Sequence, residues 1–394
     1  MIFSFSTEIL KEGAAKIVVP KTKEMLQLAP SKTPVFYNPR MKINRDIAVL
    51  VLNAFTGILD EKMVIGEPMT GCGVRGIRCA NEVKDVHRIF LNDLNPEAAK
   101  LAKMNIEKNG VSKYVKIENV DANLFLNLHS KPKRRFNYID IDPFGTPAPF
   151  IDSAVRAIRN NGLIALTATD MAPLCGVHPK ACIRKYFGKP LRVEYCHELA
   201  VRLLIGSLVL QAAKHGFGIN VLFSHSTDHY IRVYGQVRRG AREADETLSK
   251  MGYVLHCFNC FHRETSSYIP TYNDLKCGEC GEQYSVAGPL WIGALFDKNF
   301  IRKMRKEYTH LNYLHSKRLA RLLREVEEEL EEPPTYFVID KISDKLGVTV
   351  PSVKKVLKKI RSKGFAATST HFNPRGIRTD ASAKLVKKAI EECV

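Results

Sequence analysis

The sequence predicts an open α/β fold followed by a region of mixed helices and strands. From about residue 62 to residue 239, apolar strand-like runs alternate with helical runs. Glycine-rich or acidic turns follow four successive predicted strands, and beyond Arg239 the alternation stops. At 394 residues the chain is long enough for two or three domains. We therefore expect an α/β domain over residues 1–240 and an α+β domain over residues 241–394.

Charge and composition restrict the class of partner. The net charge of +19 and the pI near 9.4 indicate a polyanion, either nucleic acid or an anionic membrane surface. No uninterrupted apolar run reaches the ~18 residues that span a bilayer, and the N-terminus lacks the basic region and cleavage site of a signal peptide. Nucleic acid is therefore the expected partner, no membrane is expected, and the cytoplasm is the expected location.

The first elements frame a loop with aromatic and basic residues. Residues 8–20 are expected to form a hairpin around Gly13, and Asn44 is expected to cap a helix over residues 45–56. Phe36 and Arg45 then fall in the loop and the first helical turn. Packing and surface positions explain both residues, so this pattern alone assigns them no role.

A glycine motif follows the first strand of the alternation. Residues 62–66 predict a buried strand, which runs through Gly71, Gly73 and Gly76 into a helix over residues 77–82. This is G-x-G-x-x-G in the strand–helix context that a nucleotide site requires, although glycine turns also serve packing alone. The next strand, residues 87–91, ends at Asp93, where a carboxylate can accept hydrogen bonds from both hydroxyls of a ribose.

Two further strands end in acidic turns. Residues 114–117 lead to Asp121, which is placed to reach an adenine amino group. Residues 136–141 lead to Asp142-Pro143-Phe144-Gly145, where the proline ends the strand. A carboxylate, a backbone carbonyl and the flat ring of Phe144 together suit an exocyclic amino group, whereas the ordinary explanation is a strand followed by a turn.

Three classes of function compete for these features. A nicotinamide dehydrogenase accounts for the glycines and Asp93 but not for Asp142-Pro-Phe-Gly. A noncatalytic RNA-binding module leaves all four strand ends unexplained. An S-adenosylmethionine enzyme accounts for all of them, with methionine over the glycine loop, ribose at Asp93, adenine near Asp121 and the methyl acceptor at Asp142.

The chain also resembles the tRNA guanine-26 N2-dimethyltransferase family along nearly its whole length. The matching segments are Val35-Phe-Tyr-Asn-Pro-Arg-Met, Asn44-Arg-Asp, Gly73-Val-Arg-Gly-Ile-Arg, Asn92-Asp, Asp121-Ala-Asn, Ile141-Asp-Pro-Phe-Gly, Thr167-Ala-Thr-Asp, Ala172-Pro-Leu-Cys-Gly and Thr370-His-Phe-Asn-Pro-Arg-Gly-Ile. This resemblance implies a Rossmann-like S-adenosylmethionine-dependent methyltransferase domain that forms N2-methyl- and N2,N2-dimethylguanosine at position 26 of tRNA. The alternative is another nucleic-acid amino-methyltransferase, acting on a different tRNA guanine or on adenine N6.

The resemblance also implies roles for single residues. Asp142 is the expected catalytic carboxylate, and Phe36 and Phe144 are expected to bracket the flipped guanine. The cofactor residues that it implies are Arg45, Arg75, Asp93, Asp121 and the backbone at Ala122, with the two arginines at the methionine carboxylate.

Four of the ten cysteines form two Cys-x-x-Cys pairs, Cys257/Cys260 and Cys277/Cys280, separated by sixteen residues. Two such turns can supply four thiolates to one structural Zn²⁺, with Gly278 and Gly281 permitting the tight turns. We expect a zinc ribbon over about residues 253–290. The remaining cysteines have no framework spacing and are expected to be ordinary buried thiols: Cys72, Cys79, Cys175, Cys182, Cys196 and Cys393.

The C-terminal segment predicts a winged-helix-like unit over about residues 335–380. Two helices, residues 336–346 and 351–363, precede a strand at residues 364–370 and a loop at residues 371–379. Residues 341–388 hold thirteen lysines and arginines against two acidic residues, so we expect this domain to bind tRNA phosphates. No obligate protein partner is inferred. The sequence leaves open the number of methyl groups added, a neighbouring target guanine and the oligomeric state.

Overall fold

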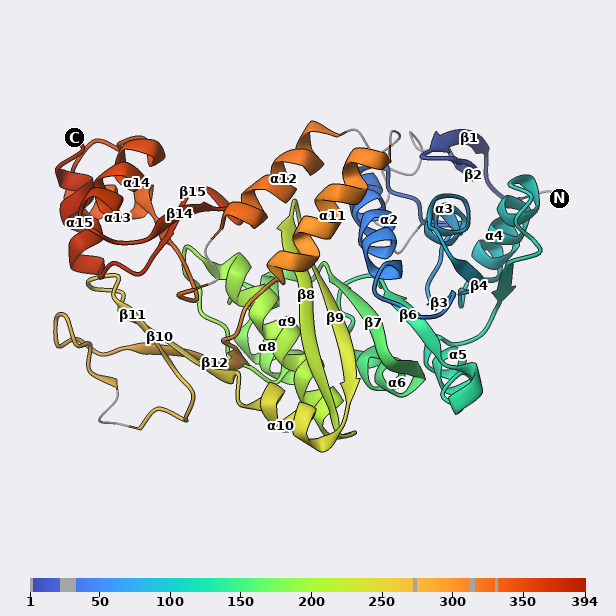
Figure 1. The fold of residues 1–394 in the computed structure, drawn as a ribbon, viewed down its shortest axis with the longest axis horizontal. Coiled ribbons are helices and arrows are strands. Elements are labelled where there is room, and N and C mark those ends of the chain that lie inside the picture. The colour runs from blue at the N-terminus through green and yellow to red at the C-terminus, as the bar shows by residue number, and fades with distance from the viewer. Residues whose placement is uncertain (1–2, 22–32, 272–274, 312–315, 330–331) are drawn as a thin grey trace. The chain divides into compact units, whose positions relative to one another are not determined.

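The computed structural model describes residues 3–21, 33–271, 275–311, 316–329 and 332–394. Its α/β part is built on a seven-stranded sheet of order β5-β4-β3-β6-β7-β9-β8 (Figure 1). The strands are β3 (Met63–Glu67), β4 (Val86–Asn92), β5 (Val115–Glu118), β6 (Phe136–Ile141), β7 (Ile158–Ala168), β8 (Phe217–Thr227) and β9 (Tyr230–Arg239).

The chain order of the strands creates a ligand crevice. Strands β3 to β7 pair in parallel, and the chain runs from β3 outward through β4 to β5 before it crosses back to β6 on the other side of β3. Strands β3 and β6 therefore flank the point where the strand order reverses, and open α/β sheets bind ligands outside the carboxyl ends of the strands at such a point. The predicted α/β fold is confirmed.

The crossovers of the sheet carry short helices. These are α3 (Val74–Glu82), α4 (Pro96–Lys108), α5 (Ala122–Leu128) and α6 (Ile151–Ala157), with α2 (Lys42–Thr56) preceding β3. Helix α3 packs with α2 and α4, whereas α5 packs with α6. Right-handed crossovers place these two sets on opposite faces of the sheet. The predicted hairpin before α2 is confirmed as β1 (Thr7–Glu12) and β2 (Ala15–Pro20), with Gly13 at φ +58°.

The helix over residues 45–56 is confirmed, but its predicted cap is wrong. Helix α2 starts at Lys42, one turn before Arg45, so Asn44 lies inside it and is fully buried. The Asn44 side chain accepts a hydrogen bond from Arg75 instead of capping the helix (2.8 Å). A side-chain cap exists six residues earlier, where Asn38 accepts from the backbone of Arg40.

Three helices follow β7: α7 (Met171–Leu174), α8 (Pro179–Tyr186) and α9 (Cys196–Ala213). By length and composition α9 could cross a membrane, but 72% of it is buried inside the protein. Its apolar character is that of a core helix, and the two charged residues within it, Glu198 and Arg202, bond to each other (2.9 Å).

The remaining elements form the Cys-rich and C-terminal segments. Helix α10 (Ala241–Leu248) precedes a three-stranded sheet, and helices α11 (Lys298–His310) and α12 (Lys317–Glu328) follow it. Its strands are β10 (Met251–His256), β11 (Arg263–Ser266) and β12 (Ser285–Trp291). Residues 272–274 of the predicted ribbon lie outside the described residues.

The C-terminal segment has the expected order, but the predicted helix over residues 336–346 begins only at Ile339, after a short strand, and two further corrections apply. It contains β13 (Phe337–Val338), α13 (Ile339–Leu346), α14 (Val353–Ser362), β14 (Ala367–Thr370), β15 (Asn373–Thr379) and α15 (Ala383–Glu391). The predicted loop at residues 371–379 is wrong over most of its length, because β15 pairs with both β13 and β14. Helix α14 starts after Ser352, which caps it, so Pro351 precedes the helix and does not open it.

By compactness the chain divides into two units. One comprises Met1–Thr167, Gln236–Arg238 and Arg302–Ala320, and the other comprises Ala168–Gly235, Arg239–Ile301 and Arg321–Val394. This division does not follow residue 240. The assignment of residues 1–240 to methyl transfer and residues 241–394 to tRNA binding stays a prediction about function.

Candidate active site and cysteine cluster

The loop between β3 and α3 is shaped by its glycines. Gly71 (φ +57°) and Gly73 (φ +81°) adopt left-handed conformations. A Cβ at Gly71 would lie 3.0 Å from the carbonyl oxygen of Phe36, so the loop before α2 passes directly over the glycine loop. At Gly76 a Cβ would meet Leu91 at 2.3 Å, which makes the third glycine a packing position between α3 and β4.

Asp93 ties the glycine loop to the end of β4. Its carboxylate accepts from the backbone of Gly71 (2.8 Å) and of Asn95 (2.9 Å). Burial raises the pKa of Asp93, and these two backbone donors oppose that rise. Each carboxylate oxygen has two lone pairs, so the same group can still accept from ribose hydroxyls.

The turn after β5 is held from two sides. Asp121 caps α5 by accepting from the backbone of Asn123 and Leu124, and Ala122 is the buried first residue of that helix. Asn92 donates to the carbonyls of Pro68 (3.0 Å) and Val120 (2.9 Å). This buried amide joins the loops after β3 and β5. Sequence reasoning did not assign it a role, although its place as the last residue of β4 was a signal.

Asp142 follows β6 and forms an ion pair with Arg75. The same guanidinium donates to Asn44 (2.8 Å) and lies 3.4 Å from Asp140 Oδ2 and 3.5 Å from Glu67 Oε1. Arg75 thus brings together the ends of β3 and β6, the two strands at the topological switch. The predicted contact of Arg75 with a methionine carboxylate is untested, and its interaction with Asp142 was not predicted.

Glu67 makes this cluster electrostatically unusual. It accepts from the Thr70 hydroxyl (2.9 Å) and the Gly76 amide (3.1 Å). Burial raises the pKa of Glu67 to about 8, against the pull of Arg75. Near neutral pH this carboxyl is therefore protonated. It has no negative charge that would compete with Asp142 for Arg75.

Arg45 lies elsewhere in the same unit. Its guanidinium binds Glu12 through Nε (2.6 Å) and Nη2 (2.7 Å) and donates to the Asn38 carbonyl (3.2 Å). Burial opposes ionisation of Glu12, but Arg45 and Arg78 lower its pKa to about 2. In this structure Arg45 anchors hairpin β1–β2 to α2, and nothing tests its predicted contact with the cofactor.

Phe36 and Phe144 meet each other directly. Their ring centroids are 4.8 Å apart and their planes are at 89°. The structure therefore places the two rings side by side, with no space for a base between them, and their predicted role of bracketing the guanine stays a prediction. Phe144 is 57% exposed, so its outer face is available for stacking.

The four predicted metal ligands converge. Cys257 lies 3.5 Å from Cys280 and Cys260 lies 3.5 Å from Cys277, sulfur to sulfur, and all four sulfurs lie within 4.8 Å of one another. Tetrahedral Zn²⁺ with bonds of ~2.3 Å requires sulfur separations of roughly 3.8 Å, so the donor set fits zinc. Gly281 (φ +76°) opens one turn as predicted, whereas the equivalent position in the other turn is Phe261 (φ +64°) and Gly278 has no such role.

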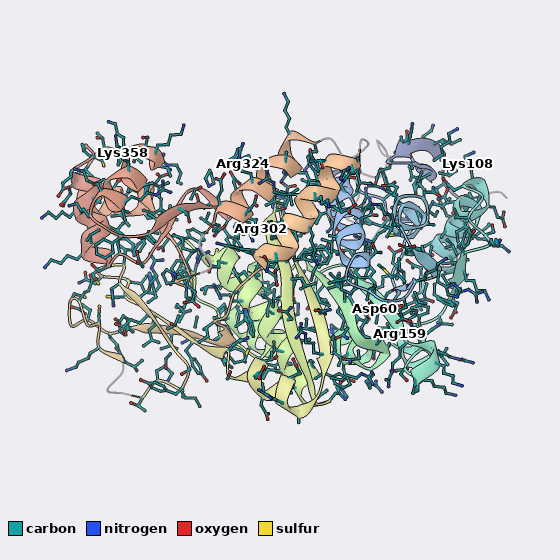
Figure 2. All side chains as sticks on the ribbon, viewed as in Figure 1. Asp60, Lys108, Arg159, Arg302, Arg324 and Lys358 are labelled. Carbon is teal, nitrogen blue, oxygen red and sulfur yellow. The ribbon has the colours of Figure 1, made fainter. Side chains whose placement is uncertain are left out.

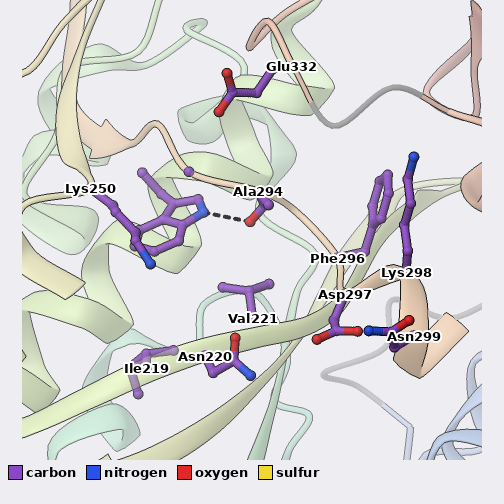
Figure 3. A pocket seen from close by; sticks show the side chains of 12 residues that line it. Ile219, Asn220, Val221, Lys250, Ala294, Phe296, Asp297, Lys298, Asn299 and Glu332 are labelled. Carbon is purple, nitrogen blue, oxygen red and sulfur yellow. Dashed lines mark hydrogen bonds between the residues drawn. The ribbon is translucent and has the colours of Figure 1, made fainter. Parts of the chain in front are cut away.

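The described surface also has a hollow of about 500 Å³ between β8 and the segment after β12 (Figure 3). The indole of Trp291 donates to the Ala294 carbonyl there (2.8 Å), and Asp297 and Lys298 line the rim. None of the predicted site residues borders it. The candidate catalytic residues lie at the ends of strands of the sheet and not in this hollow.

The chain matches a known protein family along most of its length. It matches the family model described as N2,N2-dimethylguanosine tRNA methyltransferase over residues 13–391. The tRNA (guanine(26)-N(2))-dimethyltransferase of Methanobrevibacter smithii is 39% identical, over 98% of each chain. The tRNA (guanine(26)-N(2)/guanine(27)-N(2))-dimethyltransferase of Aquifex aeolicus is 35% identical, over 98% of this chain and 96% of that protein.

A solved structure agrees with these relatives. Trm1 from Pyrococcus horikoshii, in complex with S-adenosyl-L-methionine, superposes with a TM-score of 0.86 at 35% identity, over 97% of this chain and 99% of that one. Sequence, fold and the acidic turn after β6 lead to the same conclusion: the chain belongs to the N2,N2-dimethylguanosine tRNA methyltransferase family.

Proposed function

We propose that this protein transfers methyl groups from S-adenosyl-L-methionine to the N2 atom of guanine 26 in tRNA, giving N2-methyl- and N2,N2-dimethylguanosine. The family membership and the S-adenosylmethionine complex of the P. horikoshii relative support this activity. The structural observation that carries the proposal is the ion pair of Asp142 with Arg75, at the carboxyl end of β6 and beside the glycine loop.

The residues present suit the cofactor. Gly71 and Gly73 give the loop after β3 a left-handed backbone that other residues rarely adopt, and Asp93 retains acceptor capacity for a ribose. Asp121 and the backbone at Ala122 would hold the adenine, and Arg45 and Arg75 would lie toward the methionine end. When bound, the cofactor supplies an electrophilic methyl group on a sulfonium.

Asp142 performs the chemistry that the protein itself must provide. The lone pair of guanine N2 is delocalised into the ring, so this nitrogen is a weak nucleophile. A carboxylate that accepts an N–H bond favours a tetrahedral nitrogen and receives the proton after methyl transfer. Arg75 fixes the carboxylate, and Phe144 offers a stacking face for the flipped base, with Phe36 in contact with the Phe144 ring.

The rest of the chain supports this reaction. We propose that Cys257, Cys260, Cys277 and Cys280 bind one structural Zn²⁺, because four thiolates leave no open coordination position. We also propose that residues 241–394 supply tRNA affinity and that the enzyme acts in the cytoplasm, without a membrane or an obligate protein partner. The net charge of +19 supports the tRNA assignment.

The test is mass spectrometry of nucleosides from tRNA transcripts incubated with the enzyme and S-adenosylmethionine. A transcript with guanine at position 26 should yield dimethylguanosine, and the same transcript with adenine at that position should yield none. A transcript with guanine only at position 27 tests a second candidate target, guanine 27, which the name of the A. aeolicus relative favours. Methylation of adenine in any of these transcripts would overturn the proposal.

A further inference from the structure

Three side chains outside the ribbon and the catalytic cluster bring soft donor atoms together. The sulfurs of Cys175 and Cys196 and a ring nitrogen of His197 all lie within 4.8 Å of one another. Cys175 follows α7 directly, whereas Cys196 and His197 are the first two residues of α9. By spacing along the chain these cysteines looked like unrelated buried thiols, and only the packing of α7 against α9 makes them neighbours.

The backbone holds these donors in place. The Cys175 amide donates to Met171 (2.7 Å), and the Val177 amide donates to Ala172 (2.9 Å), which closes the end of α7. Gly176 (φ +86°) lies so close to the backbone at Arg192 that a Cβ on it would stand 2.7 Å from the Arg192 nitrogen. The Cys196 amide donates to Val193 (3.1 Å), at the start of the buried helix α9. Pre-ordered ligands lower the entropy cost of binding a metal.

We propose that Cys175, Cys196 and His197 bind a second metal ion, a soft divalent cation such as Zn²⁺. Two thiolates and one imidazole match the ligand preference of zinc, and bonds of ~2.0–2.3 Å require ligand separations of roughly 3.5–3.8 Å. The observed limit of 4.8 Å is therefore closed by side-chain shifts of about 1 Å. With three protein ligands one coordination position faces water or an outside ligand, so this ion is held less tightly than the ion of the four-cysteine cluster.

The simpler explanation is a pair of hydrogen-bonded thiols beside a histidine. The two explanations differ in a quantity that does not depend on methylation activity, namely the metal content of the chain. A metal at this site would also cross-link the two ends of the segment that contains α8, and its removal should expose that segment to protease.

The experiment measures metal per chain in full-length protein purified without chelator. Wild type should carry about two zinc ions, and Cys175→Ser and Cys196→Ser about one each. The variant Cys257→Ser/Cys277→Ser, which leaves the ribbon only two thiols, should carry about one, and Cys196→Ser/Cys257→Ser/Cys277→Ser should carry none. Cys182→Ser is the matched control, because it removes a buried thiol of the same region that is outside the donor set and should keep both ions.

Cobalt titration keeps the test decisive if the weaker ion is lost during purification. In Cys257→Ser/Cys277→Ser protein, Co²⁺ should produce thiolate-to-cobalt absorption, and this absorption should disappear in Cys196→Ser/Cys257→Ser/Cys277→Ser. Circular dichroism verifies that each variant is folded. The proposal is overturned if folded Cys257→Ser/Cys277→Ser gives no cobalt–thiolate absorption, or if thiol titration shows that Cys175 and Cys196 form a disulfide.

Discussion

At the scale of single residues, one guanidinium organises the catalytic cluster. Arg75 contacts three acidic residues that lie at the ends of β3 and β6, and one of these is Asp142. An arginine in such a position can hold a carboxylate with fixed direction, which a lysine cannot do. The catalytic role of Asp142 therefore depends on a neighbour in the first turn of α3.

We expect Asp142→Ala to lower the single-turnover methylation rate by ~10²-fold or more, because it removes the proton acceptor for guanine N2. Asp142→Asn keeps an acceptor oxygen but not the base, so its rate should fall between the two. Affinities for S-adenosylmethionine and tRNA should change little. Asp152→Ala, which changes a partly buried aspartate of α6 paired with Arg156, is the control. A near wild-type rate for Asp142→Ala would show that Asp142 is not the catalytic carboxylate and that its segment is only a turn.

Glu67 should make stability depend on pH. Its folded pKa of about 8 lies above that of an unfolded glutamate, so the folded state retains a proton that the unfolded chain releases. The free energy of unfolding should therefore fall as pH rises from about 4.5 to about 8, by ~1 kcal/mol per pH unit or less. Arg75 lowers the pKa of Glu67, whereas the neighbouring Asp140 and Asp142 raise it.

Glu67→Gln should remove that dependence, since glutamine keeps an acceptor for Thr70 and the Gly76 amide. Denaturant unfolding at pH 5, 6, 7 and 8 should show the variant gaining stability relative to wild type as pH rises. Glu61→Gln is the control, because its carboxylate is about half exposed. Parallel pH profiles for wild type and Glu67→Gln would contradict this prediction.

At the scale of elements, the cysteine turns hold the sheet of β10, β11 and β12 together. Cys277→Ser should lose the ribbon zinc and destabilise residues 253–290, because a three-ligand site binds zinc less tightly. S-adenosylmethionine affinity should stay nearly unchanged. Metal analysis, limited proteolysis and calorimetric titration measure the three effects. Wild-type protein with intact thiols but no zinc would reject the ribbon assignment.

A buried ion network joins α9 to the C-terminal segment. Arg378 Nη2 lies 2.8 Å from both Glu198 and Glu329, and Glu198 also accepts from the Thr335 amide (2.8 Å). Burial opposes ionisation of Glu329, but His371 and Arg378 lower its pKa to about 2. Deleting the chain from Pro333 onward would leave Glu198 without Arg378, so truncation is a poor way to isolate RNA binding.

Arg378→Met should reduce the free energy of unfolding by ~3–5 kcal/mol, because it removes the cation that two buried carboxylates share. Arg242→Met, at an exposed pair with Glu246, should change it by ~1 kcal/mol or less. Thermal or denaturant unfolding measures both. Equal, small effects of the two variants would show that the network contributes nothing to stability.

At the scale of the whole molecule, the positive charge of the C-terminal segment is only partly available for RNA. Lys359 and Lys363 pair with Glu392, and Arg361 donates to the Ala367 carbonyl. Lys354, Lys355 and Lys358 are exposed on α14, and Lys358 extends into solvent (Figure 2). Three lysines of the helix are therefore the best candidates for phosphate contacts.

Changing Lys354, Lys355 and Lys358 to Ala should weaken tRNA binding and reduce the slope of log affinity against log salt by up to ~3, about one for each lost phosphate contact. Cofactor binding should be unaffected. A control with Lys103, Lys108 and Lys116 changed to Ala removes the same charge from exposed positions elsewhere. Identical salt slopes for wild type and the α14 variant would show that this helix is only a solvated surface.

The sequence by itself determined the α/β alternation, the glycine loop, the acidic strand ends and the four-cysteine set. These features are local, because residue spacing, turn chemistry and periodicity act over a few residues. It also predicted Asp142, Phe36 and Phe144 as one group, through the family resemblance. Tertiary structure alone decided the pairing of Arg75 with Asp142, the burial of Asn44 inside α2, the anchoring of Arg45 by Glu12 and the meeting of Cys175 with Cys196. Each of these joins residues distant in sequence or depends on burial, and neither distance in space nor dielectric environment can be read from local pattern.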